Sequence, residues 1–298
     1  MNRDLIGLGW RAELAPSILS NLDKIDVIEL IIDDYFKAPI AKLRSLSTLA
    51  KQVPMLYHGV GLGLATSLKL DQKRIEALAR VFDYLSPDLW SEHLAFVRAD
   101  KFEIGHLAAP PRNVQTLDGA LNNLEQIKRI VGTLPVLENI ATLIDPPGSR
   151  MSEPQWVSEI LGGAGCNLLL DLHNLYANAL NFGYDPIEYL ESFPLNKVKL
   201  VHLSGGKWIQ EPPGFEVKPN AKRLLDDHIH DVPDPVFELL YILGQKLSQP
   251  LTVIIERDGH YPDFNILLDQ VAKARSVLSA ARSSSRLTKG DLVECAIL

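Results

Sequence analysis

The segment Leu169-Leu170-Asp171-Leu172-His173-Asn174 carries an apolar run directly into an acid, an imidazole and an amide. A buried strand of this kind delivers polar groups at its carboxyl end. The same pattern ends five further apolar runs, at residues 55–59, 89–93, 135–139, 199–203 and 253–258. One such ending is common, whereas six of them predict that the strands share a functional site.

Strands and helices alternate along the rest of the chain. Residues 7–11 and 26–32 are two more candidate strands, the second interrupted by Glu29 and closed by Asp33-Asp34-Tyr35. Helical patterns occupy residues 40–51, 71–85, 116–131, 235–246 and 263–278, and Ser152-Glu153-Pro154 indicates a further helix start. About eight βα units, spaced roughly 20 to 50 residues apart, favour one parallel (β/α)8 TIM barrel.

The length of 298 residues suits a single barrel, because such barrels commonly run to about 250 residues as one domain. We expect one catalytic domain over residues 1–282. The stretch that begins at Ser283-Ser284-Ser285 indicates a loosely held C-terminal tail at residues 283–298.

Residues 204–233 interrupt the alternation of strands and helices. They contain Gly205-Gly206, Pro212-Pro213 and Asp226-Asp227-His228-Ile229-His230 without a strong helical pattern. Long loops in compact domains tend to be functional, so we expect part of the site here. In an extended chain Asp226 and His228 point the same way and Asp227 points away.

Composition narrows the class of protein. The net charge of −7 disfavours a nucleic-acid partner, and no apolar run approaches the roughly 20 residues that cross a bilayer. The N-terminus lacks a secretory signal, so a cytoplasmic protein is expected. Two cysteines make neither a disulfide framework nor a thiolate metal cage, and Cys166, which precedes its strand, is expected at the rim opposite the site.

The carboxyl ends of barrel strands meet at one rim, so the polar strand ends become neighbours. Imidazole and carboxylate together suit iron, manganese or zinc, and too many such groups converge for a single ion. We therefore predict a centre of two or three metals. The candidate ligands are His58, His93, Glu138, Asp171, Asn174, His202, Asp226, His228 and Glu256.

Each candidate also has a structural explanation. A lone histidine is often a hydrogen-bonded core residue. Glu138 and Glu256 could be paired with Arg257 or another cation. Asp226, His228 and His230 could belong to a solvated loop, and Asn174 could be a turn residue. Repetition at strand ends favours the metal site. The glycine-rich segment Gly59-Val60-Gly61-Leu62-Gly63 lacks the dinucleotide fingerprint and the Walker lysine, and there is no Gly-x-Ser-x-Gly elbow.

The chain resembles the DUF692, or UPF0276, family of multinuclear non-haem iron-dependent oxidative enzymes. The resemblance extends to about Leu278. Its motifs are His58-Gly59-Val60-Gly61-Leu62, Ser91-Glu92-His93-Leu94, Leu137-Glu138-Asn139, Leu169-Leu170-Asp171-Leu172-His173-Asn174, Val201-His202-Leu203-Ser204-Gly205, Asp226-Asp227-His228 with Asp234-Pro235-Val236, and Ile255-Glu256-Arg257-Asp258. Occurring together and in this order, they are a specific signal.

The resemblance implies a TIM barrel similar to xylose isomerase. It implies two or three iron ions, molecular oxygen as cosubstrate, and oxidative change of a residue, often cysteine, in a ribosomally made peptide. By resemblance the nine candidate ligands bind iron, and Glu138 is the candidate for a bridging carboxylate. Asp258 is either a nearby acid–base group or a group that supports the metal ligands. Family members often rely on a partner protein that binds the leader peptide. Two alternatives are a divalent-metal hydrolase or sugar isomerase on the same barrel and a non-enzymatic metal-binding accessory protein.

The chain departs from the family pattern at four places. Asp33-Asp34-Tyr35 stands where Glu-Asn-Tyr is usual, His173 where asparagine is common, Phe182 in an Asn-His-Gly position, and Gly206 where a histidine often follows the glycine. None of these changes removes a candidate ligand. They are expected to alter the substrate pocket, so cysteine chemistry cannot be assumed.

Overall fold

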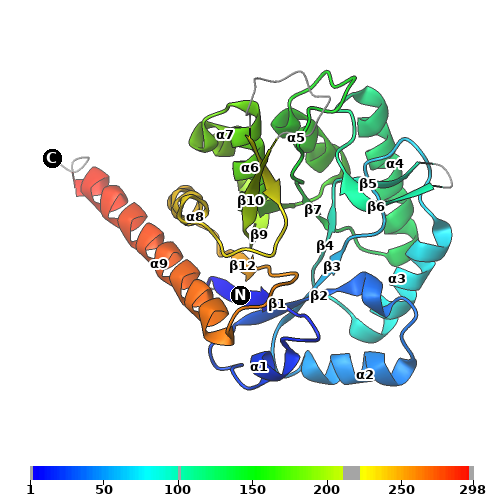
Figure 1. The fold of residues 1–298 in the computed structure, drawn as a ribbon, viewed down its shortest axis with the longest axis horizontal. Coiled ribbons are helices and arrows are strands. Elements are labelled where there is room, and N and C mark those ends of the chain that lie inside the picture. The colour runs from blue at the N-terminus through cyan, green and yellow to red at the C-terminus, as the bar shows by residue number, and fades with distance from the viewer. Residues whose placement is uncertain (1–2, 100–101, 211–221, 295–298) are drawn as a thin grey trace.

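The computed structural model describes residues 3–99, 102–210 and 222–294, with side chains described as far as residue 284. Eight parallel strands close into a barrel (Figure 1). The barrel predicted from the sequence is confirmed, and β12 pairs with β1 to close it. The strands are β1 (Leu5–Gly9), β2 (Val27–Ile31), β3 (Met55–Gly59), β4 (Trp90–His93), β7 (Val136–Glu138), β8 (Leu168–Asp171), β9 (Val198–Leu203) and β12 (Thr252–Ile255).

Helices surround the barrel (Figure 1). They are α1 (Ala15–Leu19), α2 (Ile40–Leu49), α3 (Gln72–Leu85), α4 (Val114–Val131), α5 (Glu153–Ala164), α6 (Leu172–Phe182), α7 (Pro186–Ser192), α8 (Asp234–Lys246) and α9 (Phe264–Glu294), with 3-10 turns η1 (Ile32–Tyr35) and η2 (Leu195–Lys197). The predicted helix start at Ser152 is confirmed, because its side chain caps α5 by accepting a hydrogen bond from Gln155 N at 3.3 Å.

Two antiparallel hairpins lie outside the barrel. The first pairs β5 (Phe96–Ala99) with β6 (Phe102–Ala108), within a stretch that the sequence indicated only as a connection. The second pairs β10 (Gly206–Gln210) with β11 (Lys222–Asp226). The expectation of an unstructured loop over residues 204–233 is therefore wrong for residues 206–210 and 222–226, while Pro212-Pro213 falls outside the described residues.

One helix, α6, was not predicted from the sequence, and another, α9, extends beyond its expected end. Helix α6 begins directly after β8, because Asp171 both ends the strand and caps the helix by accepting a hydrogen bond from Asn174 N at 2.7 Å. His173 and Asn174 therefore belong to a helix and not to an extended strand end. Helix α9 continues to Glu294, so it passes through the expected domain boundary at residue 282. The expected loosely held tail is thus helical as far as Glu294.

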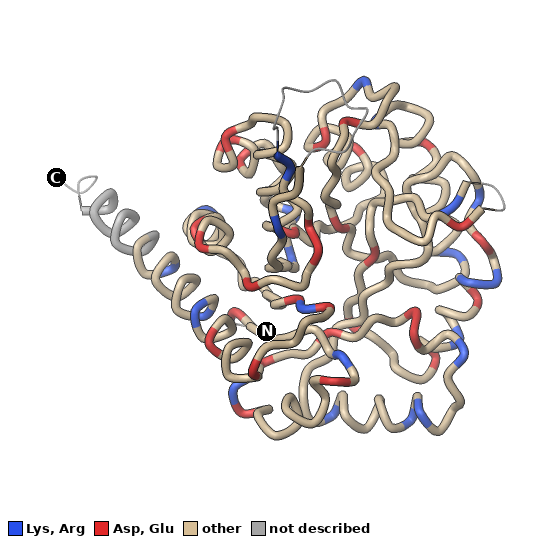
Figure 2. The backbone as a smooth tube through the Cα atoms, viewed as in Figure 1, with Lys and Arg blue, Asp and Glu red and all other residues tan. Residues whose placement is uncertain are grey.

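The core has two parts. The larger lies between the barrel and its helices. The smaller fills the base of the barrel with Leu5, Val27, Leu56, Val136, Leu169, Leu200 and Ile254, a set referred to below as the apolar floor. Among the described residues, no helix is long and apolar enough to cross a membrane. Figure 2 shows Lys and Arg spread over the outer helices, with Asp and Glu among them.

Candidate metal centre

The inside of the barrel changes from apolar to polar along its strands. Side chains two positions apart on a strand face the same side. Six residues of the apolar floor are each followed two positions later by a buried acid or imidazole, namely Glu29, His58, Glu138, Asp171, His202 and Glu256. This polar layer lies at the carboxyl ends of the strands, where TIM-barrel enzymes carry their active sites.

His58, His93 and Glu138 form the first group. Oε2 of Glu138 lies 3.4 Å from Nε2 of His58 and 3.3 Å from Nε2 of His93. Ligand atoms bound tetrahedrally at about 2.0–2.1 Å are roughly 3.3 Å apart, so both distances to Glu138 have the spacing of ligands to one metal ion. The other ring nitrogens are held in place, since Nδ1 of His58 lies 2.8 Å from Ser91 Oγ and Nδ1 of His93 donates to Gly59 O at 3.2 Å.

Burial sets the protonation state of this group. It lowers the pKa of His58 well below its ordinary value and lowers the pKa of His93 to about 4. Both imidazoles are therefore neutral near pH 7, which is the form that binds a metal.

His202 links Glu138 to the other carboxylates. Its Nδ1 lies 3.2 Å from Glu138 Oε1 and 3.1 Å from Glu256 Oε2, while its Nε2 lies 3.0 Å from Glu29 Oε1. A carboxylate oxygen only accepts, so an Nε2–H donated to Glu29 leaves Nδ1 as the atom that could bind metal. Burial opposes the charged form, but Glu256, Glu29 and Glu138 outweigh it and raise the pKa of His202 well above its ordinary value.

Glu138 belongs to two potential ligand groups. One comprises His58, His93 and Glu138, and another comprises Glu138, Asp171, His202 and Glu256; within each group, one ligand atom per residue lies within 4.8 Å of the others. Burial raises the pKa of Glu138 to about 7 and that of Asp171 to about 8. Neighbouring carboxylates also raise both pKa values by repulsion. A bound cation would stabilise the charged form of such buried carboxylates.

Asn139 orients two further oxygens. Its side-chain oxygen accepts from Asp171 N at 2.9 Å, and its backbone oxygen accepts from Asn174 Nδ2 at 3.0 Å. Because the side-chain nitrogen of Asn174 donates to Asn139 O, the side-chain oxygen Oδ1 of Asn174 points away from that carbonyl. Oδ1 of Asn174 and Oδ2 of Asp171 are both buried without a hydrogen-bond partner among the described residues. These two unpartnered oxygens fit a metal site, since oxygen donors suit hard or borderline cations.

Arg257 does not pair with the carboxylates of the polar layer. Its guanidinium donates to Asp231 Oδ1 at 2.9 Å, to Gly259 O at 2.9 Å and to His260 O at 2.7 Å. The structural explanation in which Arg257 pairs with Glu138 or Glu256 is therefore wrong.

Asp226 and His228 approach the layer from the end of the second hairpin. Asp226 ends β11, so its expected place in a loop is wrong, and His228 follows with a positive φ of 54°. Nε2 of His228 lies 2.9 Å from Asp226 Oδ2, and its Nδ1 lies 3.3 Å from Glu256 Oε2. Asp227 instead accepts from Ile229 N at 3.2 Å and lies 2.8 Å from Nδ1 of His230. Asp227 therefore contacts other partners than Asp226 and His228 do, and the expected division of metal-binding roles among the three stays a prediction.

Asp258 lies at the outer edge of the layer. Its Oδ2 is 3.5 Å from His228 Nδ1, and its other oxygen accepts from Arg11 Nε at 3.0 Å. With 43% of its side chain exposed, it can exchange protons with solvent. This position is compatible with the acid–base role suggested by the resemblance.

The glycine-rich loop at residues 59–63 binds the protein's own carboxylates. Val60 N donates to Asp33 Oδ2 at 2.9 Å, and Leu62 N donates to Glu92 Oε2 at 3.4 Å. A Cβ at Gly59 would lie 2.5 Å from the same oxygen of Glu92. The loop therefore binds the partly buried Asp33 and the buried Glu92, and these backbone donors are not free to bind a phosphate.

Glu29 is the residue of this layer that the sequence reasoning missed. It is 1% exposed and belongs with His58 and His202 to a third potential ligand group. An acid inside an otherwise apolar strand was the available signal. Combined with the two-residue spacing from Val27, that signal would have placed Glu29 in the polar layer.

Cys166 takes no part in the centre. It lies just before β8 and is buried, and burial raises the pKa of its thiol to about 11. Its expected position away from the carboxyl rim is confirmed. Cys295 lies outside the described residues.

A cavity of about 550 Å³ opens beside the polar layer. His93, Asn174, Asp226 and His228 lie on its inner side. The rest of its lining comes from the first hairpin, the segment 140–147 and β11, and is mainly apolar, including Phe96, Leu107, Ile140, Leu143, Pro146 and Leu224. The candidate ligands thus face a space that can take an organic molecule.

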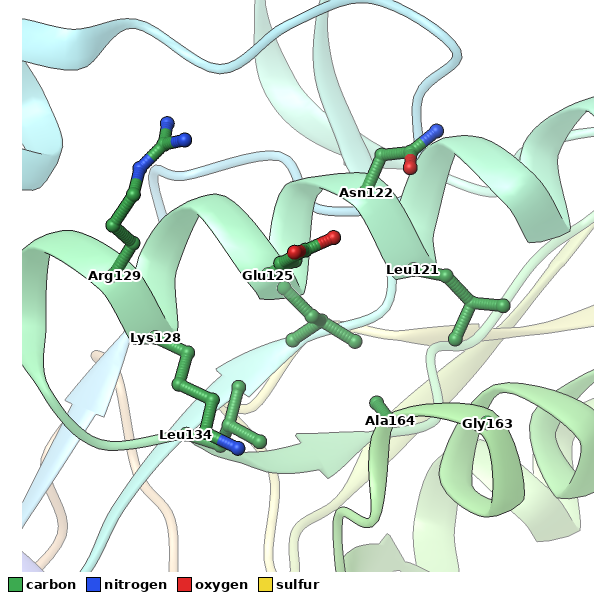
Figure 3. Close-up of a pocket in the computed structure, with 9 residues that line it drawn as sticks. Leu121, Asn122, Glu125, Lys128, Arg129, Leu134, Gly163 and Ala164 are labelled. Carbon is green, nitrogen blue, oxygen red and sulfur yellow. The ribbon is translucent and has the colours of Figure 1, made fainter.

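A second pocket lies between α4 and α5 on the outside of the barrel (Figure 3). Its lining includes Leu121, Glu125, Lys128 and Arg129 of α4 and Gly163 of α5. None of the candidate ligands lines it, so it is separate from the centre.

The fold and the polar layer together define a TIM-barrel protein with a candidate metal centre at its carboxyl rim. Residues 5–279 match the family described as RiPP precursor modification enzyme MbnB/TglH/ChrH, and the chain belongs to this family. RiPP stands for a ribosomally synthesised and post-translationally modified peptide. The predicted family membership is therefore confirmed.

Two bacterial relatives carry the name UPF0276 protein. The one from Streptomyces avermitilis is 32% identical over 282 residues, which cover 92% of this chain and 55% of that protein. The one from Acaryochloris marina is 28% identical over 276 residues, which cover 93% of this chain and 95% of that protein. The chain thus spans about half the length of the first relative and nearly all of the second.

Among solved structures, a xylose isomerase-like TIM barrel protein from Mycobacterium smegmatis in complex with magnesium has a TM-score of 0.57. It is 11% identical, and the match covers 94% of this chain and 99% of that one. The likeness confirms the xylose isomerase-like fold predicted from the sequence.

Proposed function

We propose that this protein is an iron- and oxygen-dependent enzyme that oxidatively modifies a residue of a ribosomally made peptide. The observation that carries the proposal is the shared carboxylate of Glu138. One of its oxygens faces His58 and His93, and the other faces His202. A carboxylate in this position could be a ligand of two cations at once if a centre of two or three ions formed here.

The donor set fits iron, and the choice of iron over other metals that such a site could hold rests on the family resemblance. Imidazole, carboxylate and amide oxygen suit iron, manganese and zinc better than soft thiophilic ions. The nine candidate ligands remain our proposal for the metal-binding residues. Glu29 would orient His202 by accepting a hydrogen bond from Nε2 of that imidazole. When bound, iron would supply the oxygen activation and electron transfer that these side chains cannot provide.

The protein's own residues would bind the substrate, orient it and move its protons. The apolar walls of the 550 Å³ cavity would exclude water around an inserted peptide residue. Asp258, which is half exposed and lies beside His228, would accept or return a proton at its carboxylate. We further propose that a partner protein presents the leader part of the peptide, while the residue to be modified enters the cavity.

The test is to purify the protein anaerobically after growth with iron, measure its metal content, and follow oxygen uptake with candidate peptides. Short cysteine-containing or acidic peptides encoded next to the gene are the first candidates. We expect more than one iron per chain and oxygen consumption that depends on peptide. A protein that holds zinc or magnesium and consumes no oxygen with these peptides would contradict the proposal and favour a hydrolase or sugar isomerase.

A further inference from the structure

His173 is a buried imidazole outside the proposed ligand set. It is the second residue of α6, and its side chain is 0% exposed. Its ring packs against the start of β10, since a Cβ at Gly206 would lie 2.6 Å from Cε1 of His173. Glycine at position 206 therefore leaves the space that the ring occupies.

The ring makes one short polar contact. Nδ1 of His173 lies 2.6 Å from Oδ1 of Asp226. Because a carboxylate accepts, Nδ1 carries the hydrogen and donates it. Nε2 of the same ring has no hydrogen-bond partner among the described residues. Burial of this polar ring is therefore compensated through Nδ1.

This contact separates the two oxygens of Asp226. Oδ1 receives the hydrogen bonds of His173 and of Ser204 Oγ, the latter at 3.3 Å. Oδ2 instead faces Nε2 of His228 at 2.9 Å. With Oδ1 held by two donors, rotation of the carboxylate is opposed and Oδ2 stays directed toward His228.

We propose that His173 is a positioning residue for the metal centre, holding Asp226 so that Oδ2 is offered to an ion together with His228. The inference rests on the proposed function, because it presumes that Asp226 and His228 bind metal. Hydrogen-bond partners of metal ligands fix ligand orientation, and their loss typically weakens metal binding about 10- to 100-fold.

A purely packing role for His173 makes a different prediction. Packing depends on the shape of the whole ring against Gly206, whereas positioning depends on a donor at the place of Nδ1. Two amide substitutions separate the roles. In His173→Asn the amide nitrogen is bonded to Cγ, as Nδ1 is in histidine, so the donor is kept. In His173→Gln the amide lies one bond further from the backbone, so the donor is displaced.

The matched control is His230→Gln. His230 lies two residues after His228 and makes a similar contact, because its Nδ1 lies 2.8 Å from Asp227 Oδ1. This pair faces away from the centre. Metal-free wild type and the three variants are titrated with Co²⁺ without oxygen. Visible absorption and competition with a chelator give the number of ions bound and the dissociation constant of the weakest one. Thermal unfolding checks that each variant is folded.

We expect His173→Gln to weaken the weakest site about 10- to 100-fold, and His173→Asn and His230→Gln to stay within a few-fold of wild type. Equal affinities for the two His173 variants, whether both normal or both weak, would overturn the positioning role. If the wild type itself binds neither Co²⁺ nor Fe²⁺, the proposed function fails instead. The two failures are thus distinguishable.

Discussion

Glu138 is the residue at which the contacts of the centre converge. It ends the short strand β7 and is completely buried. It was predicted from a strand ending in Glu-Asn, as were His58, His93, Asp171, His202 and Glu256 from theirs. These residues could be predicted because a parallel barrel brings strand ends to one rim. Their mutual distances could not, because they depend on strand register and on side-chain partners such as Ser91.

The first prediction concerns Glu138→Gln. The change keeps the shape of the side chain but removes the charge that would bridge two cations. We expect loss of at least one iron per chain and of peptide-dependent oxygen uptake, with cooperative unfolding preserved. Metal analysis beside a thermal unfolding curve is the measurement. Unchanged iron content and activity would mean that Glu138 is only a structural acid.

At the scale of elements, helix α6 shows why part of the site escaped prediction. Its asparagines Asn174, Asn178 and Asn181 are spaced as one helical face and are buried. Asn178 Nδ2 donates to Ile140 O at 2.9 Å, and Asn181 exchanges hydrogen bonds with Leu224 of β11. Leu172, Leu175 and Ala179 of the same helix are buried as well. The helix was missed because its first residues were interpreted as the polar end of the preceding strand.

The two hairpins escaped prediction for a related reason. Each pairs only with itself in the described sheets, and β6 is largely exposed, so neither has the apolar run of a barrel strand. The second hairpin nevertheless carries Asp226 to the centre. Residues 204–233 were expected to contribute to the site, and the structure brings Asp226 and His228 from this segment to the polar layer. The element that supports them is a hairpin held by α6 and not a loop.

The second prediction concerns this hairpin. Asp226 and His228 come from outside the barrel, so the ion they hold should be the most exchangeable. We expect Asp226→Ala or His228→Ala to abolish oxygen uptake while part of the iron remains bound. Asp227→Ala is the control and should change little, because Asp227 faces His230. The measurement is iron content beside activity for the three variants. Complete loss of iron in Asp226→Ala would contradict this division.

At the scale of the whole molecule, α9 packs across the seam where the barrel closes. Arg275 of α9 donates to Asp26 Oδ2, and the same oxygen accepts from Ile6 N at 3.0 Å. Burial alone would raise the pKa of Asp26, but the hydrogen bonds from Ile6 and Arg275 outweigh it and lower that pKa below its ordinary value. Asp26 therefore joins β1, the start of β2 and α9 through its charged form.

The third prediction is the pH dependence of Asp26→Asn. A pKa lowered by folding stabilises the protein above the unfolded-state pKa, near 3.9, and this contribution is lost as the pH falls through the folded-state pKa. We expect the variant to be less stable by about 1–2 kcal/mol at pH 7, and the difference to shrink below about pH 4. Urea unfolding at several pH values measures it, with the exposed Asp23→Asn as control. A difference that is constant with pH would exclude the charge as its cause.

The apolar floor, described above as part of the core, also constrains the order of events. Because it closes the base of the barrel, metal ions, peptide and product should all pass through the cavity at the opposite end. A peptide filling that cavity would then obstruct the escape of an ion. We expect metal loading to precede peptide binding, and saturating peptide to slow the removal of iron by a chelator severalfold. Equal removal rates with and without peptide would reveal a second route to the centre.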